Sequence, residues 1–136
     1  MSDSRQALYG AVYDALMGDA GLSALLAGGK VFDHVPRGAA FPFVSLGDCE
    51  SRPLDGDDTP AEAHRFEVLV HSRAPGRQEV SDIGSRVAAV LTGGGPLSLA
   101  GFRLVSFRLR DTSVAASRDQ RAYRARMRFE ALTEIA

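Results

Sequence analysis

Hydrophobic residues recur along the chain with two spacings, one typical of helices and one of strands. After a helix cap at Asp3 or Ser4, they return every three or four positions and form one helical stripe: Leu8, Ala11, Val12, Ala15 and Leu16. Gly18 and Gly21 bracket the end of this helix. A short further turn follows and stops at Gly28-Gly29; it is indicated by Leu22, Leu25 and Leu26. The same spacing predicts a second long helix before Gly93-Gly94-Gly95-Pro96: Val80, Ile83, Val87, Ala88 and Leu91.

Five other stretches predict β-strands: residues 30–35, 43–50, 63–72, 102–112 and 122–133. Pro36 ends the first strand and Pro42 stands at the start of the second, because proline cannot donate a hydrogen bond to a sheet. In the third strand Phe66, Val68 and Val70 share one face. The last strand follows a hairpin at residues 117–120. It places Tyr123, Ala125, Met127 and Phe129 on one face, and Arg124, Arg126, Arg128 and Glu130 on the other.

This order, α-β-β-β-α-β-β, predicts an α+β fold: a mostly antiparallel sheet with two helices packed on one face. The 136 residues are expected to form a single domain, residues 1–136. The polar stretch at about residues 52–62, rich in Pro, Gly and Asp, predicts a mobile loop.

Charge is unevenly distributed along a chain whose net charge is −1. The first 62 residues carry 4 basic and 10 acidic side chains, whereas residues 101–136 carry 8 basic and 4 acidic ones. Such asymmetry is typical of nucleic-acid binding or of subunits that join head to tail. The single cysteine, Cys49, excludes an internal disulfide and fits a reducing cytoplasm, and the sequence shows no signal peptide and no membrane span.

The sequence offers no catalytic, cofactor-binding or metal-binding set of residues. The three consecutive glycines follow a helix instead of preceding one, so they are not a phosphate loop. An EF-hand starting at Asp55 would need Gly and Glu where Pro60 and Phe66 stand. Three histidines, His34, His64 and His71, lack the spacing of metal ligands and are expected at the surface or at an interface. Cys49 lies within a predicted strand, with no glycine-rich turn to expose it as a nucleophile.

The arginine row of the last strand has three interpretations. Arg124, Arg126 and Arg128 could contact a nucleic-acid backbone, form a solvated face, or pair with carboxylates of a neighbouring subunit. Aromatic residues do not alternate with the arginines on that face, as single-strand-binding sheets usually require. The subunit interface is therefore the preferred interpretation.

Three blocks together resemble the tail-terminator, or tail-completion, family of long-tailed phages and related gene transfer agents. The first runs from Val-Phe-Asp-His-Val-Pro at residues 31–36 to Phe-Pro-Phe-Val-Ser-Leu-Gly at 41–47. The second is His-Arg-Phe-Glu-Val-Leu-Val-His-Ser-Arg at 64–73, followed by Gly-Arg-Gln-Glu at 76–79, and the third is Arg-Ala-Tyr-Arg-Ala-Arg-Met-Arg-Phe at 121–129. One departure is His71, where relatives tend to have tryptophan.

The resemblance implies a structural virion protein without enzymatic activity or cofactor. Members form a homohexameric ring on the head-proximal end of the tail tube, where the ring stops tube polymerisation and provides a docking face for the head connector, or stopper, protein. DNA passes through the lumen without specific binding, and no membrane is involved. The resemblance also implies a place in the tail of a virion or gene-transfer particle, assembled in the bacterial host cytoplasm.

Charge then suggests which residues make the contacts of such a ring. The expected subunit interface comprises Arg108, Arg110, Arg124, Arg126, Arg128, Asp48 and Glu50, and Arg126→Glu is expected to weaken the ring without unfolding the monomer. The expected contact with the tube or connector comprises Arg52, Leu54, Asp55, Asp57 and Asp58.

Two other classes of function remain open from the residues alone. A small α+β nucleic-acid-binding module would use the basic C-terminal strands and bind DNA in a salt-sensitive way. An enzyme with a site assembled between subunits would need convergent titratable groups, and the sequence offers no good set.

Overall fold

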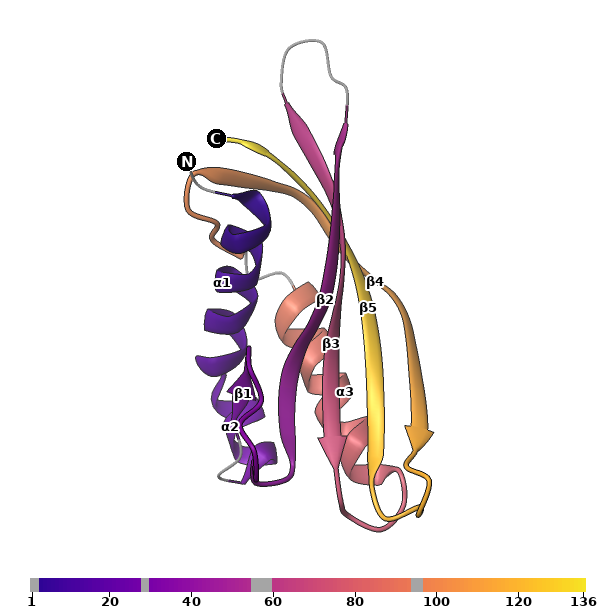
Figure 1. Ribbon diagram of the computed structural model, residues 1–136. Helices are drawn as coiled ribbons and strands as arrows, with labels where there is room; N and C mark the ends of the chain where they lie inside the picture. Colours follow the sequence, from indigo (N-terminus) through magenta and orange to yellow (C-terminus); the bar gives the residue numbers. More distant parts are fainter. Residues whose placement is uncertain (1–2, 28–29, 55–59, 94–96) are drawn as a thin grey trace.

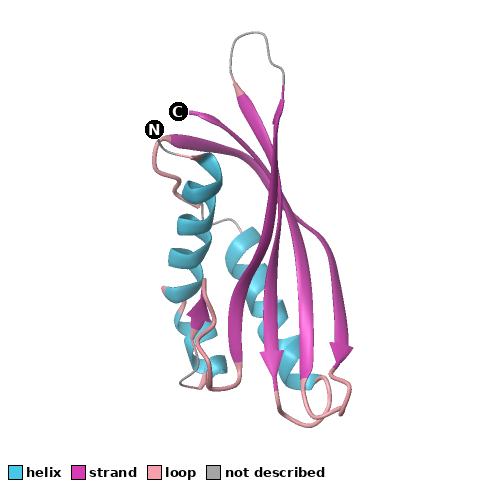
Figure 2. Cartoon of the chain, viewed as in Figure 1, coloured by secondary structure: helices cyan, strands magenta, loops and turns pink. Residues whose placement is uncertain are grey.

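The sheet of the computed structural model has five strands and one uncovered face (Figures 1 and 2). The structure describes residues 3–27, 30–54, 60–93 and 97–136. Its elements in chain order are α1 (Ser4–Met17), α2 (Ala20–Leu26), β1 (Val31–Phe32), β2 (Phe43–Leu54), β3 (Ala61–Ser72), α3 (Gln78–Thr92), β4 (Phe102–Ala116) and β5 (Tyr123–Ile135). The predicted α+β class is confirmed. The short turn expected after α1 is a separate helix, α2.

The strand order is β1-β2-β3-β5-β4, and each pair is antiparallel except β1 with β2. The two edge strands of the sheet differ in length: β1 has two residues, whereas β4 has fifteen. Three irregularities interrupt the pairing. One lies in β2 between Leu46 and Cys49, and β4 carries an extra residue at Val105 and another at Arg110. Such bulges bend a strand and increase its twist.

Helices α1 and α3 pack on the same face of the sheet because their apolar stripes match the inward positions of the strands. Asp3 caps α1, where its carboxylate accepts a hydrogen bond from the Arg5 N–H at 2.9 Å. The buried side chains of α1 and α3 follow the predicted stripes: Leu8, Ala11, Val12 and Leu16 on α1, and Val80, Ile83, Val87 and Leu91 on α3. They meet inward residues of the central strands: Phe66, Val68, Val70, Ala125, Met127 and Phe129.

The strands differ from the prediction most clearly at β1 and on both sides of the predicted loop, since β3 begins at Ala61 instead of residue 63. The first predicted strand, residues 30–35, is reduced to Val31–Phe32, and the chain then leaves the sheet. Strand β2 continues through Arg52, Pro53 and Leu54, where a loop was predicted, because these residues pair with the start of β3. The middle of that loop, residues 55–59, lies outside the described residues, as do Gly28-Gly29 and residues 94–96.

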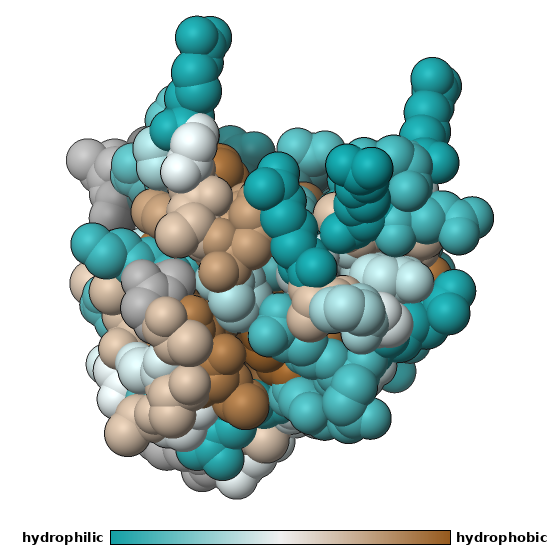
Figure 3. All heavy atoms as spheres, turned by 90° about the horizontal axis from the view of Figure 1, so that it is seen from below, coloured by the Kyte–Doolittle hydropathy of each residue, from teal (hydrophilic) through white to brown (hydrophobic). Residues whose placement is uncertain are grey.

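One end of the molecule combines apolar surface with long polar side chains (Figure 3). This is the end where β3 turns into α3 and β4 turns into β5. Seen from this end, a hydrophobic band lies beside extended hydrophilic side chains. The opposite end carries both chain termini and the far ends of β2 and β3.

Candidate functional site

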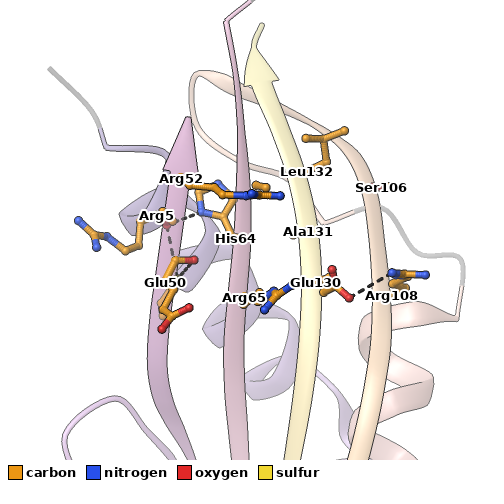
Figure 4. Close-up of a pocket in the computed structure, with 13 residues that line it drawn as sticks. Arg5, Glu50, Arg52, His64, Arg65, Ser106, Arg108, Glu130, Ala131 and Leu132 are labelled. Carbon is orange, nitrogen blue, oxygen red and sulfur yellow. Dashed lines mark hydrogen bonds and ion pairs between the residues drawn. The ribbon is translucent and has the colours of Figure 1, made fainter. Parts of the chain in front are cut away.

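The face of the sheet that the helices leave uncovered is a candidate interaction surface. Strand register places one row of alternating charge across β2, β3, β5 and β4: Glu50, Arg65, Glu130 and Arg108 (Figure 4). A depression of about 930 Å³ lies along this row. Opposite charges at directly paired positions stabilise a sheet modestly, so the row is compatible with an isolated folded subunit.

The predicted arginine row faces outward on β5. Two of its three members, Arg126 and Arg128, already have acidic partners in the same chain. Arg126 lies 3.7 Å and Arg128 lies 3.8 Å from the Glu67 carboxylate of β3. Arg128 also lies 3.8 Å from the Asp111 carboxylate of β4. A phosphate backbone would therefore compete with carboxylates of the same face, which weighs against this row as a DNA contact.

The remaining residues of the predicted subunit interface lie near opposite edges of the sheet. Arg108 and Arg110 are exposed on β4, where they contact Glu130 at 3.1 and 3.8 Å. Asp48 and Glu50 are exposed on β2, beyond the short stretch that β1 covers. The structure thus divides the predicted set into a basic edge, an acidic edge and the β5 row between them.

The predicted contact residues at the far end of β2 are only partly described. Arg52 is exposed and Leu54 is half-buried, both within β2. Asp55, Asp57 and Asp58 lie outside the described residues.

A buried polar cluster was missed by the sequence analysis, which expected His64 at the surface. His64 is 1% exposed and lies on the inward face of β3. Its Nδ1 lies 2.6 Å from the Ser51 Oγ and its Nε2 lies 2.9 Å from the Thr133 Oγ1. The Ser4 hydroxyl, buried at the start of α1, lies 3.5 Å from the same Nε2. Burial lowers the pKa of His64, so the neutral ring is favoured.

The hydrogen bonds of this cluster hold elements of the fold together and do not form a catalytic arrangement. Both ring nitrogens of His64 have hydroxyl partners, and the side chains come from α1, β2, β3 and β5. The Ser4 hydroxyl donates to the Glu62 carboxylate. Satisfying every polar group in this way makes its burial tolerable and fixes the start of α1 against the sheet. The alternation with Phe66, Val68 and Val70 was the signal for the inward position of His64.

Cys49 and His71, which the sequence analysis considered, have packing roles, and so does Tyr9. Burial raises the pKa of the Cys49 thiol, which disfavours the reactive thiolate. The Tyr9 hydroxyl donates to the Gly47 carbonyl, and burial raises the Tyr9 pKa to about 12. His71 stacks on Phe43 with ring centroids 4.4 Å apart and lies 3.0 Å from the Ser45 hydroxyl, so this ring is well packed.

Neither a metal centre nor a membrane helix emerges from the described ranges. Among these residues, no three His, Cys, Asp or Glu side chains are grouped so that they could hold a metal ion. None of the helices there is long and apolar enough to cross a membrane.

Comparisons with known proteins assign the chain to a family. A chain from the virion of a native gene transfer agent (GTA) particle is 27% identical, with a TM-score of 0.87; the match covers 98% of this chain and 99% of that one. Bacteriophage SPP1 gp17 is 23% identical and shares the fold, with a TM-score of 0.65 over 94% of this chain and 88% of its own. No curated protein matches in sequence.

The tail completion protein gp17 family matches residues 10–134, nearly the whole chain. This match and the two solved structures confirm the resemblance that the three sequence blocks indicated. They also agree with the expectation of a structural tail component without enzymatic activity. The chain belongs to the tail completion protein gp17 family and is a structural protein of the virion tail.

Proposed function

We propose that the protein forms a hexameric ring that caps the head-proximal end of the tail tube, stops tube polymerisation and provides the docking face for the head connector. The observation that carries the proposal is the match, over almost the full length of both chains, to a chain of a gene transfer agent virion. Its partners are then further copies of itself, the tail tube protein and a head-completion protein. DNA passes through the lumen without specific binding.

The two edges of the sheet support a head-to-tail ring. A ring with one repeated contact needs two different surfaces on each subunit that complement each other. Arg103, Arg108 and Arg110 give β4 an exposed basic edge, and Asp48 and Glu50 give β2 an exposed acidic one. We propose that β4 of one subunit meets β2 of the next. Charge complementarity of this kind sets register and partner choice more than affinity.

The β5 row has a secondary part in this proposal. Arg126 and Arg128 share Glu67 within their own subunit, whereas Arg124 forms no ion pair with any described residue. Arg124 is therefore the member of the row with most charge to offer a neighbour. The row as a whole still belongs to the proposed interface, because all three guanidinium groups lie on the uncovered face.

We also propose that the far end of β2 contacts the tube or the connector. Arg52 and Leu54 are the described members of this contact. Asp55, Asp57 and Asp58 are included on their sequence alone. Charged side chains can set the register of such a contact by pairing with a complementary surface.

Deletion of the gene in a particle-producing strain tests the proposal. Negative-stain electron microscopy is expected to show overlong tubes without heads beside separate filled heads. Adding the purified protein to that lysate is expected to restore joined particles with tubes of normal length. Complete particles from the deletion strain would refute the proposal, and salt-sensitive DNA binding by the purified protein would then favour the nucleic-acid-binding alternative.

A further inference from the structure

Arginines lie on the two connections at one end of the molecule, where β3 turns into α3 and β4 turns into β5 (Figure 1). Four of them are exposed and form no ion pair within the described part of the chain: Arg73, Arg77, Arg118 and Arg121. This contrasts with the ion-paired arginines of the sheet face.

The nearby carboxylates are already engaged in local hydrogen bonds. Asp119 accepts from the Ser117 hydroxyl at 2.6 Å and from the Arg121 backbone N–H at 3.1 Å. Glu79 accepts from the Ser72 hydroxyl at 2.7 Å. Neither carboxylate forms an ion pair with these arginines in the described part of the chain, although the charge of Arg73 adds to the Ser117 hydrogen bond in lowering the pKa of Asp119. The arginines of this end also outnumber these two carboxylates.

Two of the guanidinium groups are held in place over aromatic rings. The Arg73 guanidinium lies 4.2 Å from the centre of the Phe41 ring, and that of Arg77 lies 5.4 Å from the centre of the Tyr123 ring. The hairpin that carries Arg118 and Arg121 is also fixed by backbone hydrogen bonds, since the Ser117 N–H donates to the Ala122 carbonyl at 2.8 Å. Groups ordered before binding lose less conformational entropy when a partner arrives.

An apolar groove of about 310 Å³ adjoins this arginine cluster. Its lining includes Val35, Pro36, Phe41 and Phe43, and Arg73 closes one side. Val35 is 40% exposed. The aromatic rings pack against one another, with Phe41 and Phe43 centroids 5.0 Å apart, so the floor of the groove is firm.

We infer that this end is a docking surface for an acidic protein surface of the particle, with carboxylates on the arginines and an apolar side chain in the groove. The inference rests on the proposed ring and gives that ring a second contact face, opposite the far ends of β2 and β3. Arginine binds carboxylates in a bidentate way, and arginine with aromatic residues is enriched in protein interfaces. A DNA backbone would use the arginines and leave the apolar groove unexplained.

The test uses unfinished tubes and filled heads isolated from the deletion strain. Wild-type protein and variants are mixed with each, and binding is measured by co-sedimentation at two salt concentrations. Arg118→Glu, Arg121→Glu and Val35→Asp are each expected to weaken binding to the tubes or to the heads at least tenfold. Arg5→Glu, an arginine reversal at the opposite end of the molecule, serves as the matched control and should stay within twofold of wild type.

Three readouts make the test decisive. Circular dichroism confirms that each variant is folded, and Arg118→Ser, which removes charge without reversing it, replaces Arg118→Glu if the latter unfolds. Binding of all variants at the wild-type level overturns the inference while leaving the proposed ring intact. Loss of duplex DNA binding in the arginine variants, with Val35→Asp unchanged, also overturns it. Failure of wild-type protein to join heads to tubes would instead refute the proposed function.

Discussion

Arg86 of α3 binds both carboxylate oxygens of Asp19, with Nε 2.7 Å from Oδ2 and Nη2 2.8 Å from Oδ1. The same carboxylate accepts the Leu22 N–H at 2.8 Å and so caps α2. Gly21 allows this approach, since a Cβ there would lie 2.8 Å from the Arg86 Nε. One carboxylate thus both starts α2 and ties it to α3.

Replacing Arg86 with methionine is expected to raise the pKa of Asp19 toward its ordinary value. The hydrogen bond from Arg86 is the largest cause of the lowered pKa, and the Leu22 N–H is the next. The stability that the lowered pKa contributes is present above the unfolded pKa of about 3.9 and is lost as pH falls through the folded value. In the variant, the free energy of unfolding should therefore decrease less steeply as the pH falls through this range.

Carboxyl NMR titration checks this prediction. Gly21→Ala should shift the Asp19 pKa in the same direction, because the added methyl group displaces the guanidinium. Asp119 is an internal control, since its pKa is lowered by hydrogen bonds from Ser117 and the Arg121 N–H and should not change. An unchanged Asp19 pKa in Arg86→Met would contradict the assigned cause.

Stability is expected to fall as the pH drops below about 6.5 because of His64. Burial lowers its folded pKa below the unfolded value of about 6.5, so the neutral ring contributes fully above pH 6.5. As pH falls, the unfolded chain binds the proton first, and the free energy of unfolding decreases until the folded pKa is passed.

Thermal unfolding at several pH values measures this effect. His64→Gln should flatten the curve in this window and lower stability at pH 7, because the hydroxyl partners Ser51 and Thr133 lose their ring. His34→Gln is the matched control at an exposed histidine and should leave the curve as it is. The same slope in His64→Gln as in wild type would rule out His64 as its source.

Truncating Phe129 to alanine is expected to destabilise the protein by about 3–5 kcal/mol. Phe129 is fully buried and stacks on Phe66, with ring centroids 5.3 Å apart. Phe107, at the same distance from Phe129, is only half-buried, so Phe107→Ala should cost less. Urea unfolding of both variants gives the comparison, and equal losses would show that burial does not set the difference.

Reversing Arg108 to glutamate is expected to weaken ring assembly, and adding Glu50→Arg in the same chain should restore it. Both residues are exposed near opposite edges of the sheet, so the proposed contact pairs them between subunits. Native mass spectrometry of the free protein and electron microscopy of tube ends measure assembly. Arg118→Glu is the control and should leave the ring intact.

The double variant separates the proposed contact from a general effect of charge. If it assembles no better than Arg108→Glu alone, β4 and β2 do not meet in the way proposed. Arg126→Glu tests the β5 row instead of the β4 edge. Like Arg108→Glu, which faces Glu130, it also sets two carboxylates against each other within one subunit, here at Glu67.

Most of the fold could be predicted from the spacing of hydrophobic residues, because that spacing reflects the local alternation of buried and exposed positions in each helix and strand. The stripe from Leu8 to Leu16 and the alternation around Phe66 and Phe129 reappear as buried faces. Residues 52–54 were misjudged as loop, since Arg-Pro-Leu has a polar and proline-containing pattern. Pairing with β3 holds this segment in the sheet, and proline is tolerated on an edge strand.

The candidate surfaces were less predictable, because they combine residues that are distant in sequence. The partners of His64 come from positions 4, 51 and 133, and no local pattern links them. Likewise, the pairing of Arg126 and Arg128 with Glu67 depends on the register between β3 and β5. Charge totals indicated an asymmetric subunit, whereas only the strand order shows which charges lie at opposite edges.

The two bulges of β4 affect how readily a free subunit pairs with other chains through its edge strand. A long, regular and open strand recruits stray chains into non-native assemblies. In β4, the extra residues at Val105 and Arg110 break fifteen residues into shorter segments, which mismatch a regular incoming strand. Free copies of the chain are thereby poorer templates for edge-to-edge pairing through β4.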